Sequence, residues 1–376
     1  MKVAHVIAGL NDGGAEAVLY RLCANSLKHT HIVVSLMDVG KYGALLSDLG
    51  VRVYCLNMPR GRVTFGGLIR LRRILRDEKP SAMQTWMFHA DLIGGLVGRL
   101  SGIRNITWGV HSSSLDINKT SKTTILVAKL CTILSHWLPK TIVYCAEESR
   151  RVYQKLGFDE SKGVVIPNGY DVSEFYPDAV LANKVKMELG LVEEIAIIGM
   201  VARYDPQKDH YNLISALNYL NKTGVEFICL LVGSGMVGEN EELLRWIAEN
   251  GVADQVRLLG MRDDVPAIMN VLDLHVLSSS YGEAFPNVLC EAMACGTACV
   301  ATDVGDSGVI VSETGWVVPP EEAKKLALAI EEALNKKRGD KHAWNLREQL
   351  CRSRIVDNFG VEVMVGRYSD IWGDSN

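Results

Sequence analysis

The chain has 376 residues, of which 48% are hydrophobic and 22% charged, and its formal net charge is -4. Single hydrophobic cores stop growing at roughly 250 to 300 residues, so this length predicts two domains. The composition is typical of a soluble globular protein, and the slightly negative charge excludes a global attraction to nucleic acid or acidic lipid.

Nine cysteines are scattered along the chain, with no CxxC pair and no Cys/His cluster at zinc spacing. Most lie in apolar runs, which predicts reduced, buried thiols in a cytoplasmic protein and no metal site. The apolar run in MKVAHVIAGL is too short for a signal peptide, and residues 123–138 are too few and too polar to cross a bilayer. We therefore expect a chain that is not integral to a membrane.

Short β-branched runs alternate with helical patterns twice along the chain, which predicts an α/β fold of two Rossmann-like, doubly wound parallel sheets. In the first half, the expected strands cover residues 2–10, 31–38, 51–58, 81–87, 105–111, 141–146 and 163–169. In the second half, they cover residues 194–203, 226–233, 255–260, 273–280, 297–305 and 314–319. Open sheets of this kind bind ligands at the carboxyl ends of their strands, so a ligand is expected in a cleft between the two.

Prolines, acidic residues and loss of the strand pattern near residues 170–190 indicate a crossover between the halves. We predict an N-terminal domain over residues 1–172 and a C-terminal domain over 173–355. The apolar spacing of Val361, Val365, Tyr368 and Trp372 predicts a terminal helix within 356–376 that returns to the first domain.

The stretch GEAFPNVLCEAM places Glu283 and Glu291 eight positions apart around an otherwise apolar run. With Pro286 as the first helical residue and Gly296 after the last turn, the pattern predicts a helix from Pro286 to about Cys295. Free N–H groups and the positive dipole end at the start of this helix suit a diphosphate.

Carboxylates on either side of that helix start would accept hydrogen bonds from sugar hydroxyls. The pattern is thus compatible with a nucleotide sugar whose hexose lies by Glu283 and whose ribose lies on Glu291. The alternative is an exposed helical glutamate and an unrelated loop glutamate, and spacing alone favours that alternative.

The run SSSYGEAFPNVLCEAMACGTACVATDVGD, residues 278–306, resembles the E-x7-E signature of the family 4 glycosyltransferases. These are retaining, metal-independent enzymes of the GT-B architecture, and further motifs along most of the chain agree: GGAE, GVH, IPNGYD, ARYDPQKD and TGWVVPP. The resemblance implies that Glu291 binds the ribose and Glu283 the transferred sugar. It also implies that the loop of Ala284, Phe285, Pro286 and Asn287 faces the diphosphate. The chain departs from the family at Ala284 and Asp306, where glycine is frequent.

Arg203 and Lys208 directly follow a predicted strand, so they should emerge at its carboxyl end, on the ligand side. The resemblance implies that both clamp the diphosphate, whose charge grows as the glycosidic bond breaks. The alternative is that they pair with Asp205 and Asp209. No DxD motif or His/Asp cluster points to a metal, and no cofactor is expected.

In the first half, Gly13 and Gly14 would let the backbone approach a ligand closely, or they are plain turn residues. His111 ends a predicted strand. The resemblance implies that it lies near the transferred sugar, with a structural histidine as the alternative.

GSGMVG, which contains Gly233 and Gly235, follows a strand and precedes a helix, so it raises a dinucleotide-dependent oxidoreductase or epimerase as a rival. Against the rival, the next strand ends without the acidic residue that would hold a ribose. The resemblance implies that this turn lies close to the donor. It also implies that the backbone of Gly260, Met261 and Arg262 contacts the donor base. A non-catalytic nucleotide-sugar sensor is a third possibility.

Residues 59–79 and 118–140 combine basic with apolar residues, and the first segment has seven Arg or Lys against two acids. They are expected to form a solvated helix face and a buried helix, with attachment to an anionic membrane as the alternative. The resemblance implies transfer of a hexosyl or N-acetylhexosaminyl unit from a UDP-sugar or, less favoured, a GDP-sugar. The acceptor would be a glycan or lipid-linked saccharide for surface polysaccharide, bound in the cytoplasm or at the inner face of the membrane.

Overall fold

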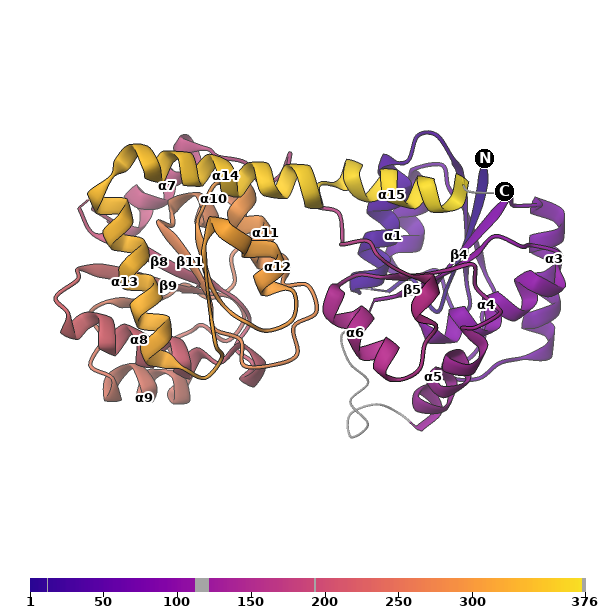
Figure 1. The fold of residues 1–376 in the computed structure, drawn as a ribbon, viewed down its shortest axis with the longest axis horizontal. Coiled ribbons are helices and arrows are strands. Elements are labelled where there is room, and N and C mark those ends of the chain that lie inside the picture. Colours follow the sequence, from indigo (N-terminus) through magenta and orange to yellow (C-terminus); the bar gives the residue numbers. More distant parts are fainter. Residues whose placement is uncertain (12, 112–121, 193, 374–376) are drawn as a thin grey trace. The chain divides into compact units, whose positions relative to one another are not determined.

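The computed structural model describes residues 1–11, 13–111, 122–192 and 194–373, which form two compact units (Figure 1). The first unit comprises Met1–Gly169 and Val361–Asn376, and the second comprises Tyr170–Gly360. The sequence places the two crossings a few residues away, after residues 172 and 355.

The first unit is built on a seven-stranded parallel sheet of order β3-β2-β1-β4-β5-β6-β7. The central strands β1, β4 and β5 are almost entirely buried, as expected where helices cover both faces of a parallel sheet. The strands are β1 (Lys2–Ile7), β2 (Thr30–Ser35), β3 (Arg52–Cys55), β4 (Ala82–Trp86), β5 (Ile106–Val110), β6 (Thr141–Tyr144) and β7 (Gly163–Val165).

Side chains alternate between the two faces of this sheet, so Val3 and Ile7 point into one core and Ala4 and Val6 into the other. The first face is covered by α1 (Gly14–Asn25), α2 (Gly40–Asp48) and α15 (Val361–Gly373). The second face is covered by α3 (Phe65–Glu78), α4 (Phe88–Leu100), α5 (Lys122–Leu134) and α6 (Glu147–Lys155).

The last helix, α15, completes the core of the first unit. Val361, Tyr368 and Trp372 are buried on it at the predicted spacing, and Val365 packs against the same core. The Asn105 amide donates a hydrogen bond to the Trp372 carbonyl at 2.9 Å. The chain therefore returns to its first sheet after building the whole second unit.

The second unit is built on a six-stranded parallel sheet of order β10-β9-β8-β11-β12-β13. Its strands are β8 (Ala196–Val201), β9 (Phe227–Val232), β10 (Val256–Leu258), β11 (Leu274–Leu277), β12 (Cys299–Thr302) and β13 (Trp316–Val318). Its helices are α7 (Ala179–Leu189), α8 (His210–Lys222), α9 (Glu241–Glu249), α10 (Val265–Val271), α11 (Asn287–Ala294), α12 (Ser307–Val311), α13 (Ala323–Gly339) and α14 (Lys341–Phe359).

Each strand in these two sheets lies inside a range that the sequence predicts, except that β2 begins one residue earlier, at Thr30. The predicted fold class of two Rossmann-like, doubly wound sheets is confirmed. The nine cysteines are free, and all except Cys55 are buried, as expected. Within the described ranges, the helices are too short or too polar to span a bilayer.

The strand orders also locate the ligand edge of each sheet. The direction of winding reverses between β1 and β4 in the first unit and between β8 and β11 in the second. Doubly wound sheets bind ligands at such switch points, beside the carboxyl ends of the strands. A ligand site is therefore expected among the residues that follow β8 and β11.

Candidate active site

The site in the second unit centres on one shared carboxylate oxygen. Lys208 follows β8, Glu283 follows β11, and the Lys208 ammonium lies 2.5 Å from Oε1 of Glu283. The Ser279 hydroxyl donates to the same oxygen at 2.7 Å. Both side chains of the ion pair are largely buried, with exposed fractions of 14% and 8%. Within the described residues, no hydrogen bond uses the other oxygen, Oε2, so it can accept one from a sugar hydroxyl.

Neighbouring hydroxyls hold the two loops of the site together. Ser278 donates to the carbonyls of Lys208 and Asp209 at 2.9 Å each. The start of the loop after β11 is thereby bonded to the end of the loop after β8. Thr302, at the end of β12, donates to the Ser279 carbonyl at 2.6 Å. The Lys208–Glu283 pair therefore has a backbone that is fixed from three strands, which is the preorganisation that electrostatic catalysis requires.

Gly305 supports the loop from the other side. Its φ of 60° lies in the left-handed region, and a Cβ there would lie 2.3 Å from the Glu283 carbonyl oxygen. The next residue, Asp306, is buried, and its N–H donates to the Ala284 carbonyl at 2.9 Å. Asp306, where the family often has glycine, thus serves the 283–284 loop through its backbone.

The helix beside this loop, α11, begins one residue later than predicted. Pro286 is its N-cap rather than its first helical residue, because its ψ of 96° is extended although its φ of -72° would fit a helix. No side chain caps this end among the described residues. Phe285 is buried against Tyr170 and Phe359 and anchors the turn, whereas Asn287 is exposed at the helix start. The N–H of Leu289 donates to the Pro286 carbonyl at 3.1 Å, whereas no described side chain caps the N–H groups of Asn287 and Val288, as an anion site needs.

Glu291 lies further along α11 and is half-buried. Leu289 and Met293, which the sequence places on the opposite side of the helix, are fully buried. The two glutamates thus flank the start of α11, Glu283 in the preceding loop and Glu291 in the second turn.

Arg203 is the exposed member of the cationic pair. Its side chain is 62% exposed, and its Nε lies 3.1 Å from Asp205 Oδ2, so the expected alternative of a pair with Asp205 is present. An exposed ion pair of this kind contributes only about 0 to 1 kcal/mol, so a diphosphate can compete for the guanidinium. The alternative prediction that Lys208 pairs with Asp209 is wrong. Lys208 pairs with Glu283, and Asp209 caps α8 by accepting a hydrogen bond from Asn212 N–H.

Glycines at the ends of β9 and β10 bring their loops against the β8 loop. Gly233 has φ 137°, and a Cβ there would lie 2.2 Å from the Ala202 carbonyl oxygen. Gly233 N–H donates to the Gly260 carbonyl at 2.7 Å, and Tyr204 N–H to the Ser234 carbonyl at 2.7 Å. Gly235 lies against Tyr204. The GSGMVG turn is thus needed to close three loops together.

Among the residues expected at the donor base, Met261 is exposed, and the side chain of Arg262 forms ion pairs within the protein. The Arg262 guanidinium binds Glu188 at 2.6 Å and Asp264 at 2.7 Å, and these carboxylates raise its pKa. Its side chain therefore ties this loop to α7, and only its backbone stays available to a ligand.

The carboxyl edge of the first sheet has a different character. Gly13 caps α1 in an extended conformation, and a Cβ on Gly14 would meet nothing within 4 Å. His111 follows β5 and stacks on Trp86 with ring centroids 4.9 Å apart. Burial lowers the pKa of His111 to about 4, so the ring is neutral at physiological pH. Its Nε2 has no hydrogen-bond partner in the described part of the chain.

Of the predicted site residues, the structure brings Lys208 and Glu283 into direct contact, with Ala284, Phe285 and Asn287 following in the same loop. Gly233 and Gly260 meet in a second cluster, next to the loop that begins with Arg203. The sequence reasoning missed Ser278 and Ser279. Their signal was available, because a run of hydroxyl residues at the end of a buried strand directly precedes the glutamate.

A buried cluster of His5, Cys23 and His31 in the first unit has ligand atoms within 4.8 Å of one another, although the sequence predicts no metal site. The hydrogen bonds assign it another role. Trp86 Nε1–H donates to His5 Nδ1 at 3.3 Å, which places the His5 proton on Nε2, facing His31 Nδ1 at 2.9 Å. A metal on Nε2 would have to displace that proton. The cluster instead packs against Trp372 of α15.

Two doubly wound units, with a fixed cation and carboxylate at a switch point beside an uncapped helix, define an enzyme that handles a nucleotide-linked substrate. Residues 12–174 match the family model described as Glycosyltransferase Family 4, and residues 183–350 match that of Glycosyl transferases group 1. The chain belongs to the family 4 type of GT-B glycosyltransferases, and it is a glycosyltransferase.

Similar proteins support this assignment over most of the chain. The UDP-Gal:alpha-D-GlcNAc-diphosphoundecaprenol alpha-1,3-galactosyltransferase of Escherichia coli is 24% identical over 82% of this chain and 79% of its own. The 2-deoxystreptamine glucosyltransferase of Streptomyces kanamyceticus is 26% identical over 85% of this chain and 87% of its own. These comparisons give the oxidoreductase alternative no support.

The fold is shared with solved structures. Anabaena Alr3699/HepE in complex with UDP superposes with a TM-score of 0.82 at 21% identity, covering 99% of this chain and 100% of the other. A glycosyltransferase from Rickettsia africae ESF-5 superposes with a TM-score of 0.79 at 19% identity, covering 100% and 99%.

Proposed function

We propose that the chain is a retaining, metal-independent transferase that moves a hexosyl or N-acetylhexosaminyl unit from a nucleotide sugar to a hydroxyl of a glycan or lipid-linked acceptor. The observation that carries the proposal is the buried Lys208–Glu283–Ser279 cluster next to the uncapped start of α11. It offers one carboxylate oxygen to hydroxyls, with a fixed positive charge and free N–H groups beside it.

In this proposal, the donor lies along the carboxyl edge of the second sheet. Glu283 Oε2 accepts from hydroxyls of the transferred sugar, and Glu291 accepts from the ribose diol. Arg203, Lys208 and the N–H groups of the 284–287 turn hold the diphosphate. The glycine turn at Gly233 and Gly235 lies near the donor, and the backbone of residues 260–262 contacts the base. The first unit contributes Gly13, Gly14 and His111 near the transferred sugar and binds the acceptor.

Retention of anomeric configuration would follow from a same-face displacement. The acceptor oxygen bonds to the anomeric carbon on the side from which the diphosphate leaves, and the departing phosphate oxygen takes the proton of the acceptor hydroxyl. Negative charge therefore grows on the leaving group in the transition state. Arg203 and Lys208 stabilise that charge more strongly than they stabilise the bound donor, so they raise turnover rather than only affinity.

A UDP-sugar is the favoured donor, with a GDP-sugar as the alternative. The name of the Escherichia coli relative specifies UDP-Gal and a diphosphoundecaprenol-linked acceptor, and the Anabaena protein binds UDP and UDP-glucose. By analogy, we place this chain in the synthesis of surface polysaccharide.

Thermal shift with UDP, GDP, ADP and NAD tests the donor class. A ligand present at 100 times its Kd stabilises the folded chain by about 2.7 kcal/mol, so the matching nucleotide stands out. We expect UDP to give the largest shift and Glu291→Ala to abolish most of it. Stabilisation by NAD, with none by the three nucleoside diphosphates, would contradict the proposal.

We further propose that the first unit attaches to an anionic membrane surface through α5. Leu126, Leu130, Ile133 and Trp137 follow one another at helical spacing and are 59%, 40%, 63% and 64% exposed. The expectation of a buried helix therefore holds only for the face that carries Ala128 and Cys131 and is wrong for the opposite face. Residues 123–140 contain lysines and no acidic residue, which suits an anionic surface. Residues 118–121 of the same expected segment lie outside the described residues.

Helix α3, in the other expected segment, has a basic outer face with exposed Phe65 and Ile69, in keeping with a solvated helix. Vesicle pelleting tests the exposed face of the α5 segment. Ile133→Ser with Trp137→Ser should reduce binding to phosphatidylglycerol vesicles. The control pair Leu328→Ser with Leu346→Ser, 55% and 52% exposed in the second unit, should not. Binding that does not depend on anionic lipid would remove the proposal.

A further inference from the structure

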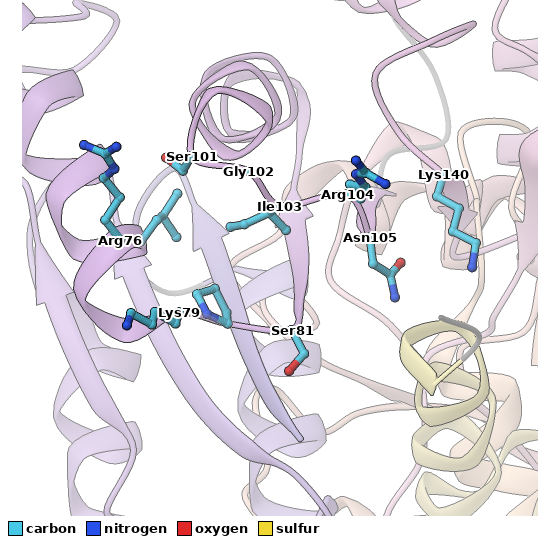
Figure 2. Close-up of a pocket in the computed structure, with 11 residues that line it drawn as sticks. Arg76, Lys79, Ser81, Ser101, Gly102, Ile103, Arg104, Asn105 and Lys140 are labelled. Atoms are coloured by element: carbon cyan, nitrogen blue, oxygen red, sulfur yellow. The ribbon is translucent and has the colours of Figure 1, made fainter. Parts of the chain in front are cut away.

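The first unit has a hollow of about 810 Å³ at the amino edge of its sheet (Figure 2). It lies between the end of α3, the loop from α4 to β5, and the residues directly before β4 and β6. Gly13, Gly14 and His111 follow strands of the same sheet and so lie at its carboxyl edge. The hollow is therefore separate from the candidate active site, and its volume lies within the roughly 300 to 1000 Å³ of small-molecule sites.

Among the residues that the structure describes, the charged side chains lining this hollow have one sign. Arg76, Lys79, Arg104 and Lys140 line it, and no described Asp or Glu does. Figure 2 shows Arg76 and Lys79 on one side of it and Arg104 and Lys140 on the other. Cations of one sign around a concave surface raise the local concentration of anions.

Nearby described carboxylates leave three of the four cations without an ion pair. Arg76, Lys79 and Arg104 form no ion pair with any residue that the structure describes. Glu78, which directly precedes Lys79, is buried and already bound by Lys2 and Arg52 at 2.9 and 2.7 Å. The positive charges of Arg76, Lys79 and Arg104 therefore remain available to a ligand.

The fold does not require this convergence of cations. Arg76 and Lys79 lie at the end of α3, where they also offset the helix dipole. Arg104 and Lys140 instead enter strands and have no helix end to offset. Arg99 donates to the carbonyls of Arg104 and Leu138 at 3.1 and 2.8 Å, and this ties the two strand-entry segments together.

The floor of the hollow is fixed as well. Leu75, Ile103 and Asn105 are buried, and the Asn105 amide is bonded to the Trp372 carbonyl at 2.9 Å. Ser81 N–H donates to the Lys2 carbonyl at 2.9 Å, which holds the approach to β4. A ligand would thus meet a preformed floor and need to order only the long side chains at the rim, which limits the entropic cost of binding.

We propose that this hollow binds a phosphorylated ligand, with its phosphate or diphosphate group held between Arg76 and Lys79 on one side and Arg104 and Lys140 on the other. Guanidinium groups form paired hydrogen bonds to phosphate oxygens, and ammonium groups add point charges. The phosphate belongs either to a soluble compound or to a lipid headgroup. Leu100, 70% exposed and adjacent to the α4–β5 loop, would contact the acyl region in the second case.

Titration with inorganic pyrophosphate tests the proposal. The chain carrying Arg203→Ala and Lys208→Ala is used as background, so that the proposed donor site does not contribute. Adding Arg76→Gln with Arg104→Gln should weaken the measured Kd at least about tenfold, the scale of one lost charge-assisted hydrogen bond. Arg62→Gln with Arg72→Gln removes the same charge from exposed positions outside the hollow and should change Kd less than about twofold.

Pelleting with phosphatidylcholine vesicles, with and without phosphatidic acid, distinguishes the two sources of the phosphate. A dependence on phosphatidic acid that is lost in Arg76→Gln with Arg104→Gln, and weakened by Leu100→Ser, indicates a lipid headgroup. Pyrophosphate binding without such a dependence indicates a soluble ligand. The proposal is overturned if the background chain does not bind pyrophosphate, or if the hollow and control pairs weaken Kd equally. Loss of the UDP thermal shift on Arg203→Ala, with pyrophosphate binding to the background chain retained, would concern the proposed donor site only.

Discussion

At the carboxyl edge of the second sheet, Lys208 and Ser279 share one oxygen of Glu283, and Gly305 lies against the carbonyl of that glutamate. At the same edge of the first sheet, His111 rests on the face of Trp86, and Gly14 opens onto empty space. The edge of the second sheet is thus fixed by charges and hydrogen bonds. The edge of the first sheet has a stacked ring pair and a glycine with open space around it.

The difference agrees with the chemistry proposed for each unit. A nucleoside diphosphate brings two or more negative charges, so its site must hold cations and N–H groups in place before it arrives. A sugar hydroxyl is neutral and is positioned by shape and single hydrogen bonds. Substitutions in the second unit should therefore damage donor binding and turnover together, whereas those in the first should spare nucleotide affinity.

The largest effect is expected for Lys208→Ala. The lysine is mostly buried and neutralises Glu283, so its loss removes a preorganised charge from the leaving group and leaves the carboxylate without its cation. Turnover should fall by about 10² to 10³, the scale measured for single groups that stabilise transition-state charge. Steady-state kinetics with the nucleotide sugar selected by thermal shift would measure it, and kcat should change more than KM.

Lys222→Ala provides the matched control for this experiment, because it removes an exposed lysine at the end of α8. Its kinetics should equal those of the unmodified chain. If Lys208→Ala kept its kcat and only raised KM, the lysine would serve donor capture alone, and the contrast between the two edges would lose its catalytic meaning.

Gly305→Ala should have the next largest effect. Gly305 and Gly190 have nearly equal φ angles of 60° and 58°, so an alanine at either costs about 1 to 2 kcal/mol of left-handed strain. A Cβ at residue 305 also meets the Glu283 and Ala284 carbonyls, whereas one at residue 190 meets nothing within 4 Å. Urea unfolding should therefore show Gly305→Ala to be about 1 to 3 kcal/mol less stable than Gly190→Ala.

The same pair of variants also probes nucleotide binding. Gly305→Ala should displace the 283–284 loop and weaken UDP binding, while Gly190→Ala should keep the affinity of the unmodified chain. Equal stability and equal affinity in the two variants would show that the loop of the second unit can shift freely, contrary to the rigid edge described above.

The sequence predicts the sheets well because each strand is a buried apolar run in a parallel sheet. Such a run can be recognised from its own residues, without knowing which strands lie beside it. It also places Arg203, Lys208 and Glu283 at strand ends. It does not reveal that Lys208 contacts Glu283, because they lie 75 positions apart and only the order of β8 and β11 brings them together.

Other features of the site escape the sequence for similar physical reasons. Arg262 looks like any exposed loop arginine until Glu188, from another helix, is found beside it. Pro286 satisfies the φ of a first helical residue, so only its ψ shows that the helix starts one residue later. The amino-edge hollow collects cations from three separate segments, none of which carries a motif.

The smallest effect is expected for His111→Ala in the first unit. One ring nitrogen, Nε2, has no hydrogen-bond partner among the described residues and can serve a ligand. Its loss should therefore cost kcat/KM about tenfold, the scale of a single hydrogen bond, and leave UDP affinity unchanged. Burial keeps the folded-state pKa near 4, below the unfolded value of 6.5. The neutral ring therefore favours the folded state fully above pH 6.5, and this contribution is lost as the pH falls toward 4. Between pH 5.5 and 8, the ratio of kcat/KM for the two chains should stay constant. An inflection near 6.5 that disappears in the variant would show that His111 titrates as an exposed histidine and that the first edge, too, carries charge.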